Sequence, residues 1–283
     1  MIFLALLTKE LRSRMRKERT IWVLIIYVLL MCVPGLLLIS RISDYSSYSN
    51  DGFSALGTYL YILLSMIQLF LILFITPAYT STTVNGEKER QTYDLLLCSQ
   101  LTSLSLVGGK LVAGIVNALL LVAASIPLFS LVFFFGGVSP LQILSAMLIY
   151  VVTALLSGTY GLFCSTVFSR PALSTAITYV TGIVWIVMPP ISAYLWYISN
   201  LQSQPSSNTI TLFFAWNPVM ALVSSYPTGG GIPAITLGSI TIAAWQTYVL
   251  ISLAATVLFF VLSLWTVKPS FTRHLLIGER GAG

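Results

Sequence analysis

A charged segment separates two long apolar runs: Val84-Asn-Gly-Glu-Lys-Glu-Arg-Gln-Thr-Tyr-Asp-Leu-Leu-Leu-Cys-Ser-Gln-Leu-Thr-Ser-Leu-Ser-Leu-Val-Gly-Gly-Lys110. It begins with a turn signal at Asn85-Gly86 and has five charged residues within the next eight positions. The pattern predicts a helix from about Glu87 to Cys98, with charges in its first turn and leucines in its last. A connection of roughly two to eight residues is enough to join two helices. We therefore predict that this segment is a contact surface for a cytosolic partner.

The composition of the chain is that of a polytopic membrane protein. Of its 283 residues, 57% are hydrophobic and 8% are charged, whereas soluble domains carry about 25% charged residues. At about 20 residues per span, the length allows about six spans and no sizeable soluble domain. The net charge of +6 is interpreted as a signal of orientation, because cytoplasmic loops collect Lys and Arg. Nucleic acid is therefore not an expected partner.

Residues 1–19 have the pattern of a basic amphipathic helix. They contain six Lys and Arg residues, and their apolar residues fall at helical spacing. We predict an interfacial helix on the inner membrane surface. Its candidate functional residues are Lys9, Glu10, Arg12 and Arg16. The alternative is a basic tail that only sets topology; a signal peptide is disfavoured because the following apolar run is too long and lacks a cleavage site.

Six apolar runs are predicted to cross the membrane within one domain covering residues 1–283. The predicted spans are 20–40, 55–78, 106–135, 141–168, 172–198 and 246–267. Pro34-Gly35 is expected to kink the first span, and Pro189-Pro190 to break the fifth near its far end. Gly136-Gly137 predicts a tight turn between the third and fourth spans. The predicted fold class is therefore an all-α membrane protein with six transmembrane helices.

Residues 199–245, called the outer segment below, contain no Asp, Glu, Lys or Arg. Within them, Ile210 to Tyr226 is apolar enough to be a seventh span, but it is short and contains Pro218. With six spans, both termini lie on the inner side of the membrane together with 13 of the 14 Lys and Arg residues, and Arg41 alone lies outside. With seven spans, 10 of these residues lie inside and 4 outside. The positive-inside rule favours six spans. The outer segment is then a re-entrant or interfacial element whose backbone must be buried in protein.

Four motifs resemble those of permease subunits of ABC-2 type (type V) transporters. Leu7–Arg12 resembles the opening Lys-Glu-Leu of the family's interfacial helix, and Gly109-Lys110 resembles its Gly-Lys at the third span. Gly86–Leu97 is similar to its signature after the second span, which is Gly-Glu, a charged pair, Gly-Thr, an acid and leucines. Asn217-Pro218 is similar to the Asn-Pro or Ser-Pro of its outer segment. The chain departs from this pattern at Gln91, where Gly is common, and at Gln100-Leu101, where many members have Pro.

The resemblance implies that residues 84–104 include a cytoplasmic coupling helix that docks on an ABC ATPase. The residues expected to couple to that partner are Glu87, Lys88, Glu89, Arg90, Thr92, Asp94, Leu95 and Leu96. Two ATPase copies and a second permease, identical or related, are implied as partners beside the lipid bilayer. The candidate outer gate consists of Trp216, Asn217 and Pro218. The charge count over six spans predicts a multi-pass protein with both termini in the cytoplasm, and the resemblance implies a prokaryotic plasma membrane.

The chain lacks the sequence patterns expected of an enzyme. Gly108-Gly109-Lys110 has neither the upstream Gly nor the following hydroxyl residue of a P-loop, so ATP and Mg²⁺ are expected to bind to the partner subunit. His274 is the only histidine, and the three cysteines show no metal-ligand spacing. We therefore expect no catalytic residue, cofactor or metal in this chain.

The predicted function is the permease subunit of an ATP-driven exporter for a hydrophobic or amphipathic substrate. The spans have no clear ionisable group, which argues against an ion-coupled carrier. Their polar side chains are assigned to bonding between helices rather than to substrate contact. These residues are Gln68, Asn117, Thr153, Ser157, Thr159, Tyr160, Thr178 and Thr181. Two alternatives stay open: an ATP-independent carrier or channel, and a membrane anchor or assembly subunit without transport of its own.

Overall fold

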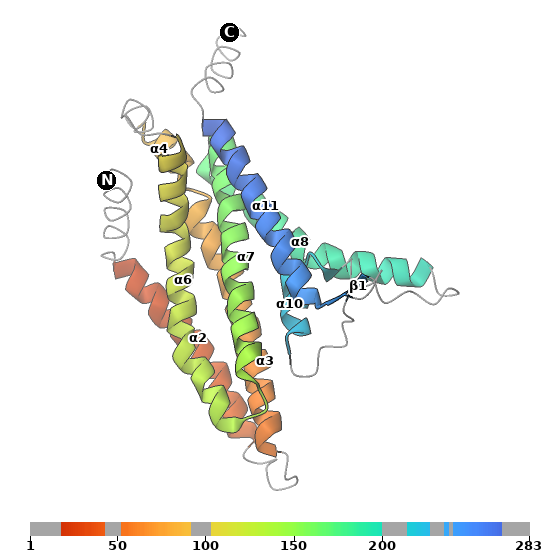
Figure 1. Ribbon diagram of the computed structural model, residues 1–283. Coiled ribbons are helices and arrows are strands. Elements are labelled where there is room, and N and C mark those ends of the chain that lie inside the picture. The colour runs from red at the N-terminus through yellow and green to blue at the C-terminus, as the bar shows by residue number, and fades with distance from the viewer. Residues whose placement is uncertain are drawn as a thin grey trace.

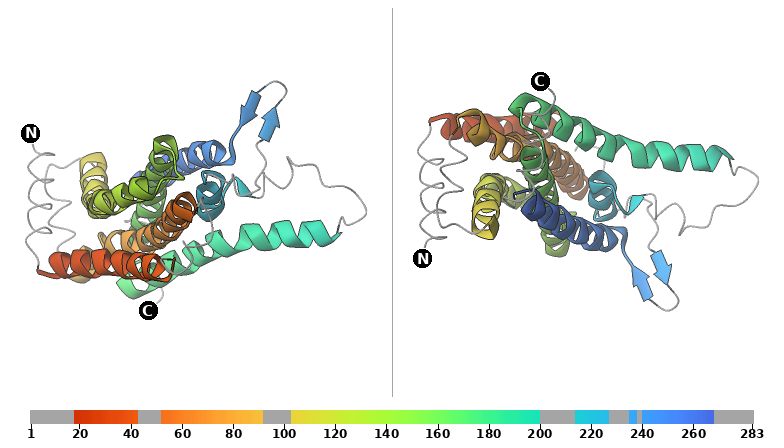
Figure 2. Two further views of the ribbon diagram at one scale, coloured as in Figure 1. Left: turned by 90° about the horizontal axis from the view of Figure 1, so that it is seen from below. Right: turned by 90° about the horizontal axis from the view of Figure 1, so that it is seen from above.

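The computed structural model describes residues 18–42, 52–91, 103–199, 214–226, 235–237 and 240–267. Five long helices run side by side in a bundle, as Figure 1 shows: α2 (Glu18–Ile42), α3 (Gly52–Thr80), α6 (Ser103–Phe135), α7 (Pro140–Val167) and α11 (Ala244–Val267). Helix α8 (Pro171–Ser199) starts at one end of the bundle and then extends away from it (Figure 2). The short elements are α4 (Asn85–Glu89), α10 (Pro218–Ser224), β1 (Ile235–Leu237) and β2 (Ile240–Ile242). Residues 1–17 of the expected interfacial helix lie outside the described residues.

Five helical stretches among the described residues are long and apolar enough to cross a membrane. They are Ser54–Glu89, Val107–Phe135, Pro140–Val167, Pro171–Trp196 and Ala244–Val267. Helix α2 has 25 residues and contains the apolar stretch Trp22–Leu37. The protein is thus a multi-pass, helical membrane protein with five candidate spans. The count of six spans and their boundaries stay predictions.

Helix α7 is the centre of the bundle and packs against α3, α6, α8 and α11. Its Tyr150 is fully buried and donates a hydrogen bond to the Ser65 carbonyl of α3 at 3.1 Å. From the α3 side, Tyr61 donates to the Gln142 carbonyl of α7 at 3.0 Å. A buried hydroxyl is costly unless it is bonded, so these two contacts favour one rotation of α3 against α7.

The turn between α6 and α7 is confirmed at Gly136-Gly137. Both glycines have positive φ, 78° and 83°, which other residues adopt at a cost. A Cβ at Gly137 would lie 2.1 Å from the Ser54 carbonyl oxygen, so no larger residue fits there. Helix α7 then begins with a capping box between Ser139 and Gln142. The turn and the cap together explain why the chain reverses direction at this point.

One expectation about the later part of the chain is wrong. Pro189-Pro190 does not break the fifth apolar run, because α8 continues through both prolines to Ser199. The all-α class is confirmed, and a short antiparallel hairpin in which Ile235 pairs with Ile242 is added to it. Its sequence signal is Ile-Thr-Leu and Ile-Thr-Ile separated by two residues, Gly238-Ser239. Within the stretch that could be a seventh span, α10 has seven residues, and the decision against that span stays a prediction.

Candidate functional site

The segment that leads into α4 is bonded to two neighbouring helices. Ser165 of α7 accepts hydrogen bonds from the backbone N–H groups of Val84 at 2.8 Å and Asn85 at 3.1 Å, and donates to Asn85 Oδ1 at 3.2 Å. Ser174 of α8 donates to the Ser81 carbonyl at 2.8 Å. Asn85 and these serines are fully buried, where a lost bond leaves an unsatisfied group. The segment is therefore expected to move together with α7 and α8.

Glu87 and Lys88, both expected to contact a partner, have side chains that bond to other helices of the bundle. Glu87 Oε2 forms an ion pair with Lys110 Nζ of α6, and Lys110 Nζ also donates to the Thr83 carbonyl at 2.9 Å. Lys110 is only 2% exposed, so its charge depends on these partners. Lys88 Nζ donates to the Thr166 carbonyl of α7 at 2.9 Å.

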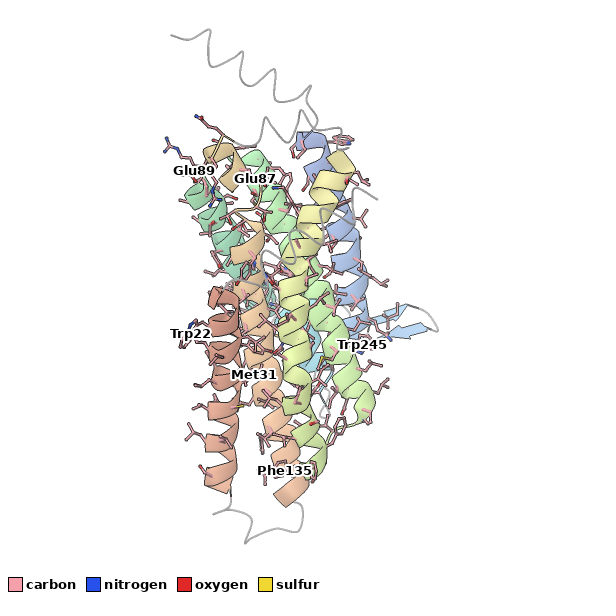
Figure 3. The ribbon with its side chains drawn as sticks, turned by 90° about the vertical axis from the view of Figure 1, so that its left-hand side faces the viewer. Trp22, Met31, Glu87, Glu89, Phe135 and Trp245 are labelled. Carbon is pink, nitrogen blue, oxygen red and sulfur yellow. The ribbon has the colours of Figure 1, made fainter. Side chains whose placement is uncertain are left out.

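Glu89 and Arg90 are exposed. Figure 3 shows Glu89 at the outer side of α4 and Glu87 nearer the neighbouring helices. The expected helix from Glu87 to Cys98 is wrong in its extent, because α4 ends at Glu89 and Gln91 has φ 57°. A residue with positive φ cannot continue an α-helix. The other expected coupling residues, Thr92, Asp94, Leu95 and Leu96, lie outside the described residues.

Asn217 of the outer segment joins α10 to α8. Its Oδ1 caps α10 by accepting bonds from the N–H groups of Val219 at 2.8 Å and Met220 at 3.4 Å. Its Nδ2 donates to the Ile186 carbonyl at 2.7 Å. In an uninterrupted helix that carbonyl would accept from residue 190, but Pro190 has no N–H. Asn217 therefore supplies the donor that proline lacks, which helps to explain why α8 is not broken there.

The other two candidate gate residues lie beside this contact. The Trp216 carbonyl accepts a bond from Trp185 Nε1 at 2.8 Å, while the Trp216 side chain is 58% exposed. Pro218 is the first residue of α10, a position where its missing N–H costs nothing. Helix α10 packs against α3, α7 and α11, so the outer segment reaches the bundle interior at this point. The structure brings the three residues together, and a gating role for them stays a prediction.

An apolar pocket lies between α3, α7, α8 and α11. Its volume is about 940 Å³, including the open space at its mouth. Four residues expected only to bond helices together, Ser157, Tyr160, Thr178 and Thr181, are part of its lining. Because its walls come from helices far apart in the chain, no local sequence pattern indicates the pocket. Among the described residues, no group of three or more His, Cys, Asp or Glu is placed to hold a metal ion.

Comparison with known sequences gives a match that covers nearly the whole chain. Residues 4–274 match the family described as "ABC-2 family transporter protein". The matched range contains α4, the outer segment and all the helices that line the pocket. No individually curated protein matches the chain.

Proposed function

The chain belongs to the ABC-2 family of transporter proteins, and from this premise we propose that it is the permease subunit of an ATP-driven exporter. A separate cytosolic ATPase, present in two copies, would bind ATP and Mg²⁺. A second permease, identical or related, would complete the transporter. The substrate would be hydrophobic or amphipathic, and both termini would face the cytoplasm of a prokaryotic cell.

The observation that carries this proposal is the division of charges on α4. Glu89 and Arg90 are exposed and available to a partner, whereas Glu87 and Lys88 bond to α6 and α7. A force applied to the exposed side of α4 would therefore reach both helices. Rigid elements that share such contacts tend to shift together. We infer that α4 couples the ATPase to the membrane helices.

A second set of contacts supports a path from α4 to the outer segment. Helix α8 is bonded to the α4 segment through Ser174 and to α3 through Tyr179, which donates to the Phe74 carbonyl at 2.8 Å. Farther along, α8 is bonded to the outer segment through Ile186 and Asn217. In this mechanism, closure of the ATPases pushes on α4. Helices α3 and α8 then shift against the second permease, and the outer segment opens.

The test uses the complete transporter, purified with its co-purifying ATPase and reconstituted in vesicles. Replacing Glu89 and Arg90 together by Ala should lower transport about tenfold, as expected when about 1.4 kcal/mol of contact is lost. ATP hydrolysis by the bound ATPase should no longer depend on substrate, and thermal stability should not change. Arg170→Ala is the matched control, because Arg170 is exposed in the turn before α8.

Transport at the normal rate in the double variant would show that the α4 charges do not couple. If the purified chain carries no ATPase and transports alone, the carrier or channel alternative replaces the proposal. If the purified chain carries no ATPase and does not transport, the membrane-anchor alternative replaces the proposal.

A further inference from the structure

The apolar pocket between α3, α7, α8 and α11 has the lining of a ligand site. It is open to its surroundings, since the 940 Å³ includes the space at its mouth, and small-molecule sites are lined mainly by apolar and aromatic side chains. No Asp, Glu, Lys or Arg lines it. Aromatic side chains form much of its wall: Phe74, Tyr160, Tyr179, Trp185, Trp216 and Phe259. The pocket therefore offers extensive apolar contact and no charge.

The polar side chains that α7 and α8 contribute to the lining already donate their hydrogen bonds within the protein. Tyr160 OH donates to Thr181 Oγ1 at 3.0 Å, and Tyr179 OH donates to the Phe74 carbonyl at 2.8 Å. Trp185 Nε1 donates to the Trp216 carbonyl. Three hydroxyls donate to carbonyls of their own helices, namely those of Ser157, Thr178 and Thr181. A polar ligand group placed here would find few free donors, and its burial would be costly.

We propose that this pocket binds the hydrocarbon chain of an amphipathic substrate whose polar head remains outside it. The proposal rests on the proposed transport function and specifies the class of substrate. Lipid tails are as apolar as apolar side chains. An acyl chain therefore binds here only if the pocket wall packs against it more closely than the lipid tails of the bilayer do. A concave wall with six aromatic side chains provides that packing over several methylene groups.

Gly182 allows the pocket to be filled without disturbing the bundle. It lines the pocket, and a Cβ added to it meets no other atom within 4 Å. Gly182→Leu therefore places a side chain in open space, and Leu favours the helix more than Gly does. Val180→Leu is the matched control, because Val180 is on the same helix, is 60% exposed and is not part of the lining.

The experiment labels the intact chain in lipid nanodiscs with a palmitoyl lysophosphatidylcholine that carries a diazirine on its acyl chain. After irradiation, mass spectrometry of peptides locates the label. We expect it to concentrate on the pocket-lining parts of α7 and α8 and to be competed by excess unlabelled lysophosphatidylcholine. In Gly182→Leu, labelling of these peptides should fall about tenfold, because the added side chain displaces methylene groups of the ligand. Val180→Leu should label like the unchanged chain.

Label that is spread evenly over the exposed faces of α2, α6 and α8, or that is not competed, would mean ordinary lipid contact and would overturn the proposal. A second copy whose side chains fill the pocket would also overturn it. That case would appear as absent labelling together with disulfide-linked dimers of an Ile183→Cys chain, since Ile183 lines the pocket. Dimers that keep the competed label would agree with the proposal. No ATPase takes part in this experiment, so its failure leaves the coupling test of α4 unaffected.

Discussion

The two short helices α4 and α10 are both anchored to longer helices by side chains that bond to backbone groups, but they use different chemistry. The α4 junction, defined as Ser81–Arg90 with its contacts, has a buried ion pair and bonds to α6, α7 and α8. The α10 junction, defined as Asn217 with its contacts, depends on one uncharged amide beside a proline of α8. Charged contacts with several helices favour a rigid connection. A single amide at a proline is easier to break and to restore, as a gate requires.

The largest expected effect concerns Lys110. Lys110→Met would leave the Glu87 carboxylate and the Thr83 carbonyl without this donor. Removing one partner of a buried pair costs about 3–5 kcal/mol, and we expect the lower end because the Glu87 side chain is 29% exposed. Thermal unfolding of the detergent-solubilised protein measures the loss.

The control for Lys110 is the double variant Glu87→Gln, Lys110→Met. It removes both charges, so it should be more stable than Lys110→Met alone. Equal stability of the two variants would mean that Glu87 and Lys110 do not interact in the solubilised protein.

The second effect concerns Asn217 and should depend on Pro190. Asn217→Ala removes the cap of α10 and the donor to the Ile186 carbonyl, which should cost about 2–3 kcal/mol. In a Pro190→Ala chain, the new N–H of residue 190 can donate to that carbonyl within α8. Asn217→Ala should therefore cost about 1 kcal/mol less in that background.

A double-mutant cycle on thermal unfolding measures this coupling. Trp216→Ala is the control, because the Trp216 side chain is 58% exposed and the substitution keeps the backbone carbonyl that accepts from Trp185, so little stability should be lost. If Asn217→Ala costs the same with Pro190 and with Ala at position 190, the amide does not replace the missing donor of the proline.

The sequence predicts the helices better than it predicts the junctions between them. Long apolar runs indicate where α3, α6, α7, α8 and α11 lie, and Gly136-Gly137 indicates the turn before α7. The contact of Asn217 with Ile186 joins residues 31 positions apart, and no local pattern indicates it. For the same reason, the charges of Glu87 and Lys88 suggest a solvent-facing surface, although both bond inside the bundle. Charge alone does not tell which side of a short helix faces a partner.

The smallest expected effect concerns Gln91, where the ABC-2 pattern commonly has Gly. Gln91 has φ 57°, the left-handed conformation that Gly adopts readily and that costs other residues about 1–2 kcal/mol. Because Gly is also more flexible in the unfolded chain, we expect Gln91→Gly to stabilise the protein by only about 0.5–1 kcal/mol. Arg90→Gly is the matched control, since Arg90 has φ −81° and should gain nothing. A rise in thermal stability for Gln91→Gly alone would show that the chain turns at residue 91. If both variants lose stability equally, α4 continues beyond Gln91, and the exposed coupling surface is longer than Glu89 and Arg90.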